Sequence, residues 1–218
     1  MILPPPPQGP PALQRAEVQE VSSWWRQVGA PPLTRFAQVT YERYGVAYVE
    51  VSYFADRTGL RAHVGGEARG DRALDALIRG QVASATRVRY LMGVSAEKLR
   101  AFRVSNLQRY WPKGTFDPEA TEAQAFLSQA GCAVDPDDRM EYLFRPEGTL
   151  HLQVRRSRPR RYTAPALVKA VRAFELTDQV GNASAQEALR GGLAKLLREP
   201  ASGGPAEGAG PRRTTGRP

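Results

Sequence analysis

Two pairs of short β-type segments, each pair divided by a turn signal, constrain the fold of this chain most strongly. Residues 46–64, VAYVEVSYFADRTGLRAHV, carry β-branched and aromatic residues on both sides of residues 56–59. MEYLF and TLHLQV repeat this arrangement around residues 145–148. Such runs on either side of a turn predict β-hairpins. Residues 34–43 have spacing that suits a helix or a strand, and their β-branched and aromatic residues favour the strand.

Helical spacing of apolar residues separates and flanks these strands. It predicts helices over residues 12–28, 71–92, 96–111, 118–130, 164–176 and 184–197. Together the elements predict an α+β fold in which two small antiparallel sheets pack on helices. Both halves follow a similar order, so an internal α-βββ-αα duplication is one interpretation. The other is coincidence, because hairpins followed by helices are common.

Composition divides the chain into four parts. Residues 1–11 are proline-rich and predict a disordered N-terminus. Residues 12–111 and 112–198 are predicted to form the first and second α+β units. Residues 199–218 lack core-forming side chains and predict a disordered tail.

The sequence also indicates a compartment. Cys132 is the single cysteine, so neither an internal disulfide nor a cysteine-based zinc site can form. The chain has no apolar run of membrane-spanning length and no signal-peptide pattern at its start. These features predict an intracellular soluble protein, cytoplasmic or nucleoid-associated, with no membrane partner and no cofactor.

The charge distribution is the main functional signal. The formal net charge is +9 and the isoelectric point is about 10.1. Residues 151–172 hold seven basic side chains and no acidic one, whereas residues 117–141 hold seven acids against Arg139. A basic chain of this kind commonly meets an anionic polymer or surface. The segregation of the two signs predicts a polarised surface.

The stretch VRRSRPRRYT, residues 154–163, concentrates this charge at the end of a predicted strand. Guanidinium groups bind phosphates bidentately, and the start of the following helix offers free N–H groups to an anion. We therefore predict a non-enzymatic nucleic-acid-binding protein that contacts phosphates, with DNA favoured over RNA. The residues assigned to this site are Arg155, Arg156, Arg158, Arg160, Arg161, Tyr162 and Lys169, supported by Arg79, Arg87, Arg100 and Arg103.

Aromatic residues suggest a second element of such a site. A base-stacking platform would use the aromatics of the first predicted sheet, although core packing is the commoner role of such residues. These residues are Tyr41, Tyr44, Tyr48, Tyr53 and Phe54.

Other functional classes have weaker signals. The first alternative is an adaptor whose basic hairpin end docks an acidic partner or a second copy of the chain. The second is a metal-dependent nuclease built on Glu50, Asp56, Glu67 and Asp71. Neither His63 nor His151 has a partner at metal-ligand spacing, and the acidic turn at 135–138 lacks a calcium-loop pattern. Enzymatic activity therefore stays uncertain, with the balance against it.

Overall fold

A single antiparallel sheet of six strands organises the molecule. The computed structural model describes residues 22–43, 45–65, 69–112, 114, 116–177 and 183–199. Each strand pairs with its neighbour in sequence, so the sheet order is β1-β2-β3-β4-β5-β6. The strands are β1 (Thr34–Arg43), β2 (Val46–Ala55), β3 (Ser84–Tyr90), β4 (Arg139–Phe144), β5 (Leu150–Val154) and β6 (Arg160–Tyr162).

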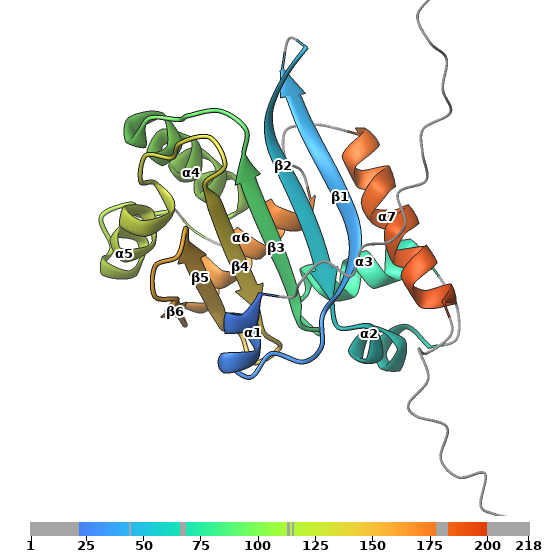
Figure 1. Ribbon diagram of the computed structural model, residues 1–218. Coiled ribbons are helices and arrows are strands. Elements are labelled where there is room, and N and C mark those ends of the chain that lie inside the picture. Colours follow the sequence, from blue (N-terminus) through green and yellow to red (C-terminus); the bar gives the residue numbers. More distant parts are fainter. Residues whose placement is uncertain are drawn as a thin grey trace, which may run out of the picture.

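Helices cover the two faces of this sheet unequally, as Figure 1 shows. The helices are α1 (Ser23–Gln27), α2 (Arg57–Val64), α3 (Gly70–Ile78), α4 (Ala96–Tyr110), α5 (Thr121–Ala130), α6 (Pro165–Thr177) and α7 (Ala183–Arg198). All except α1 contribute to one large core against the sheet. On the opposite face, α1 packs its tryptophans on a small separate cluster that includes Phe54, Ala85 and Leu143.

Side-chain alternation explains why the two faces differ. Successive residues of a strand point to opposite faces. In β3, Val88 and Tyr90 are buried toward the large core, whereas Arg87 and Arg89 point to the other face and are partly exposed. The polar face is therefore encoded within the strands, and α1 covers one end of it.

The α+β class is confirmed, but one sheet replaces the two predicted sheets. Strands from both predicted units belong to it, because β3 pairs with β4 along six residues. An internal duplication is not shown, and the division at residues 111 and 112 stays a prediction. The predicted disordered ends, 1–11 and 199–218, lie outside the described residues apart from Glu199.

The largest local error concerns residues 71–92, predicted as one helix. The helix α3 ends at Ile78, and Gly80 follows in the left-handed region with φ of 74°. The chain then forms the strand β3, whose sequence SATRVRY alternates with a period of two. The predicted helix was too long because apolar residues continue at helical spacing on both sides of Gly80, the residue that stops the helix.

The first predicted hairpin is wrong in its second strand. Residues 57–64 form the helix α2, because the carboxylate of Asp56 accepts the backbone N–H of Gly59 at 3.0 Å and caps the helix. The strand β2 pairs instead with β1, across a turn at Gly45 with φ of 76°. The strand at 34–43 and the second hairpin are confirmed.

The other predicted helices agree with the structure within a few residues, with one segment undescribed. The helix α4 follows Ser95, whose side chain accepts the N–H of Lys98. The helix α5 begins at Thr121, later than predicted from Pro118. Of the helix predicted over 12–28, only the part from residue 22 is described. No helix in the described ranges is long and apolar enough to cross a membrane, and the cytoplasmic or nucleoid location stays a prediction.

A close contact between α7 and β1 generates the first prediction. A Cβ atom added to Gly192 would lie 2.0 Å from the carbonyl oxygen of Phe36, so only glycine fits there. We expect Gly192→Ala to lower the free energy of unfolding by about 1–3 kcal/mol, because the helix must move off the strand. The shift in the urea midpoint at unchanged slope measures this loss.

The neighbouring glycine provides a matched control. A Cβ atom at Gly191 would meet nothing within 4 Å. Gly191→Ala should therefore stabilise α7 by about 0.5–1 kcal/mol, because alanine favours the helix. Equal effects of the two substitutions would show that α7 is not seated against β1 as described.

Candidate functional site

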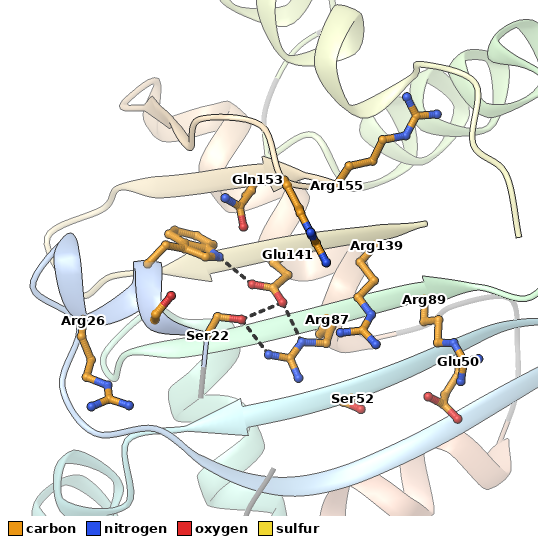
Figure 2. A pocket seen from close by; sticks show the side chains of 13 residues that line it. Ser22, Arg26, Glu50, Ser52, Arg87, Arg89, Arg139, Glu141, Gln153 and Arg155 are labelled. Carbon is orange, nitrogen blue, oxygen red and sulfur yellow. Dashed lines mark hydrogen bonds and ion pairs between the residues drawn. The ribbon is translucent and has the colours of Figure 1, made fainter. Parts of the chain in front are cut away.

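The polar face of the sheet contains a groove beside α1. Its volume is about 800 Å³, and Figure 2 shows its side chains. We call it the arginine groove, after the six arginines that line it together with Glu50 and Glu141: Arg26, Arg87, Arg89, Arg139, Arg155 and Arg156. Cationic side chains are therefore in excess over carboxylates among the residues that line the groove.

Glu141 is the centre of the hydrogen-bond network in this groove. Its carboxylate accepts from the Nε of Arg87 at 2.6 Å, the Nε1 of Trp24 at 2.6 Å and the Oγ of Ser22 at 2.7 Å. Arg87 also donates to the hydroxyl of Ser22 at 2.7 Å and lies over the ring of Trp25 at 5.5 Å. These contacts fix α1 against β3 and β4, and they satisfy the buried carboxylate of Glu141.

Two further arginines at the end of the groove away from α1 have carboxylate partners. Arg89 contacts Asp137 at 2.6 Å, and Arg155 contacts Asp138 at 2.8 Å. A hydrogen bond from the backbone N–H of Asp135, and then the bond from Arg155, lower the pKa of Asp138, although burial opposes this. Asp137 and Arg155 both have positive φ, 70° and 56°. The acidic turn therefore holds arginines in place.

A second polar group lies in the large core, between the sheet and the helices α4 and α6. Arg103 is 4% exposed and donates to Glu175 at 3.2 Å and to the hydroxyl of Tyr90 at 3.3 Å. Its guanidinium lies 5.5 Å from the ring centre of Tyr142 and 5.4 Å from that of Phe174. Burial alone would lower the pKa of Arg103, but interactions with Tyr142, Tyr90 and Glu175 raise it above its ordinary value.

Arg172 is a second buried guanidinium in the same core, and it is held differently. It is 5% exposed, donates to the carbonyl of Arg145 at 3.0 Å and lies 5.3 Å from the ring centre of Phe144. Its Nε, like that of Arg103, has no hydrogen-bond partner, but no described carboxylate lies within ion-pair distance of Arg172. Burial lowers the pKa of Arg172 to about 10, with Glu147 acting weakly in the other direction.

The structure separates the eleven residues assigned to the predicted nucleic-acid site. Three line the arginine groove: Arg87, Arg155 and Arg156. Three are exposed in or beside the edge strand β6: Arg158, Arg160 and Arg161. Four belong to helices or their ends on the other side of the sheet: Arg79, Arg100, Arg103 and Lys169. Tyr162 is buried, and its hydroxyl donates to Gln129 at 2.7 Å.

Several of these side chains are already engaged within the protein. Arg79 pairs with Asp75 on α3 at 3.0 Å, and Arg100 donates to Gln124 at 3.2 Å. Arg103 belongs to the core. No single surface collects the predicted site.

The aromatic platform does not form in the part of the chain that the structure describes. Tyr41 and Tyr53 are buried with their hydroxyls 3.0 Å apart, and Phe54 packs under α1. Tyr48 is half-buried, and Tyr44 lies outside the described residues. The alternative role of these rings, core packing, is the one observed.

Comparisons with known proteins identify the fold. No family model and no curated protein matches this sequence. Among solved structures, the fold is similar to that of the fatty-acid binding protein AtFAP1 from Arabidopsis thaliana. The two chains are 12% identical, the match covers 77% of this chain and 88% of that chain, and the TM-score is 0.59. At this identity the likeness shows a shared fold.

The comparison overturns the predicted function. The solved structure with the similar fold is named as a fatty-acid binding protein, which contradicts nucleic acid as the predicted partner. The physical reason is that the arginines assigned to the nucleic-acid site lie on different surfaces or in the core, so they form no continuous phosphate-binding surface. The described residues contain no cluster of three metal-ligating side chains, and Glu67 lies outside them.

Sequence reasoning missed the carboxylates that organise both polar sites. Glu141 and Glu175 appear in the sequence as ordinary members of an apolar strand and an apolar helix. The alternation of TRVRY was a usable signal, because a strand there places Arg87 and Arg89 on one face. No sequence signal pairs Arg103 with Glu175, which are 72 residues apart.

The Glu141 network generates the second prediction. We expect Glu141→Gln to lower the free energy of unfolding by about 2 kcal/mol, because the charge is lost and the amide nitrogen would face the donor of either Arg87 or Trp24. Urea denaturation followed by tryptophan fluorescence measures it. Asp75→Asn, which breaks the exposed pair with Arg79, should cost under about 0.5 kcal/mol. Similar costs for both would contradict the stated role of Glu141.

Proposed function

We propose that this protein binds a fatty acid in the apolar layer between the sheet and the helices α3 and α6, with the ligand carboxylate at Arg172. One observation carries the proposal: Arg172 is a buried cation without a carboxylate. The solved structure with the similar fold is named as a fatty-acid binding protein, and this supports the class of ligand.

The balance of buried charges in the core supports the binding of an anion beside Arg172. On the helical side of the sheet the buried charged residues of the described chain are Arg103, Arg172 and Glu175. Glu175 neutralises Arg103, and the nearby Glu147 is exposed and pairs with Arg145. A buried charge without a partner is costly. At neutral pH Arg172 remains protonated, because its pKa is about 10. A ligand carboxylate would supply the counter-charge and accept from the unpartnered Nε.

The apolar side chains that α6 and α3 bury suit an alkyl chain. The helix α6 buries Leu167, Val168 and Val171, and α3 packs beside it with Leu74 and Leu77. The tail would lie among these side chains once α3 and α6 move apart. Each buried methylene contributes about 0.8 kcal/mol, so affinity should rise about fourfold per methylene until the space is filled.

Arg103 serves as an internal comparison rather than as the head-group site. Its charge is already matched by Glu175, so a second carboxylate there would place two anions beside one cation. Replacing both members of a buried ion pair by apolar residues is often tolerated. The double variant Arg103→Met with Glu175→Met therefore removes this pair while retaining a folded protein.

Displacement of a fluorescent fatty acid by dodecanoate and by dodecanol tests the proposal. We expect the parent protein to prefer dodecanoate by about 10–100-fold, the range for a charge-assisted hydrogen bond. Arg172→Met should abolish this preference without lowering the Tm, because it removes an unpaired buried charge. The Arg103→Met/Glu175→Met variant should keep the preference.

The outcomes separate the function from the position of the head group. A parent protein that binds neither compound, or binds both equally, would overturn the fatty-acid proposal. Loss of the preference in the double variant, with Arg172→Met unaffected, would place the carboxylate at Arg103 instead.

A further inference from the structure

The arginine groove lies on the opposite face of the sheet from Arg172 and is independent of the fatty-acid proposal. Its floor consists of two adjacent rows of cross-strand partners. In one row Glu50 lies opposite Arg89, and Arg89 lies opposite Arg139. In the other, Arg87 lies opposite Glu141. Arg155 extends the first row, because its backbone N–H donates to the carbonyl of Arg139 at 2.6 Å.

Three carboxylates near the groove pair with particular arginines, whereas Glu50, which lies opposite Arg89, forms no ion pair among the described residues. Glu141 binds Arg87, Asp137 binds Arg89, and Asp138 binds Arg155. Arg139 and Arg156 have no ion-pair partner among the described residues. Both line the groove, and both are exposed. Their charge is therefore available to a ligand from solution.

Arg139 lacks the carboxylate partner that its two neighbouring arginines have. Like charges directly opposite each other in a sheet are destabilising. Arg139 lies opposite Arg89 and beside Arg155, each of which pairs with a carboxylate, whereas no described carboxylate is within ion-pair distance of the Arg139 guanidinium. In Figure 2, Arg87 and Arg139 project into the same space from neighbouring strands. The Glu141 network holds Arg87 and α1 in place, so this concentration of guanidinium groups is preformed.

The geometry points to a binding site for a compact anion that carries two or more phosphate groups, centred on Arg139 and Arg156. Guanidinium groups bind phosphate oxygens bidentately. A volume of about 800 Å³ lies within the usual range for small-molecule sites. A phosphorylated metabolite and a phosphorylated lipid headgroup share this chemistry, and the experiment distinguishes them.

Calorimetric titration of the full chain at about 0.15 M salt tests the site. The free probes are pyrophosphate and inositol hexakisphosphate, and the lipid probe is a phosphatidylcholine vesicle containing phosphatidylinositol bisphosphate. Binding of a free probe identifies a soluble ligand class, and binding of the vesicle alone identifies the headgroup. A parent protein that binds none of the three overturns the proposal.

A pair of charge-matched variants separates a built site from general attraction. Arg139→Gln with Arg156→Gln should weaken binding about tenfold or more, the size expected for two charge-assisted contacts. Arg158→Gln with Arg161→Gln removes the same charge from exposed positions outside the groove and should change the Kd less than about twofold. Equal weakening by both pairs would mean unspecific attraction and would overturn the site.

Thermal unfolding provides a second, ligand-free measurement. Arg139→Gln relieves the repulsion from Arg89 and should raise the Tm by about 1 °C. A lowered Tm would show that Arg139 supports the fold, and the argument for an unfilled anion site would fail.

Discussion

The unequal covering of one sheet is the constraint on which the rest of the structure depends. A strand that alternates valine with arginine can bury only one face, and β3 does this with Val88 and Tyr90 against Arg87 and Arg89. The helices cover the apolar face, while α1 covers one end of the polar face through the Glu141 contacts. A groove on the second face follows, since among the described residues no further layer covers the strands there. The arginine groove is therefore a consequence of the alternation of side chains along the strands.

An arginine that pairs with a carboxylate supports the fold, whereas an arginine without such a partner is available to a ligand. Glu175 neutralises Arg103 in the core, and Glu141 neutralises Arg87 at the edge of α1. In a medium of low polarity such pairs are tolerated only when both partners are present. Arg172 is an exception to this pattern, because no described carboxylate neutralises it. The lack of a partner costs more free energy in the core than it would on the surface. An exposed arginine without a partner is hydrated by water, whereas a buried one is not.

Local signals predicted much of the fold, and distant pairing explains the errors. The second hairpin, the strand at 34–43 and the helix after Ser95 follow from alternation, composition and a capping residue. The helix predicted over 71–92 failed at Gly80, and the first hairpin failed at the Asp56 cap. Both features were visible in the sequence but were outweighed by the apolar pattern. The joining of both halves into one sheet required the β3–β4 pairing, which no local signal encodes.

The basic segment at 154–163 shows why charge density along a chain is a poor guide to a site. The positive φ of Arg155 turns the chain after β5, and Arg155 and Arg156 line the groove. The segment then forms the edge strand β6, and Arg160 and Arg161 are exposed there. Meanwhile the groove gains arginines from α1, β3 and β4. A long polyanion following the segment would leave the groove within a few residues. A compact anion would contact arginines that only the fold brings together.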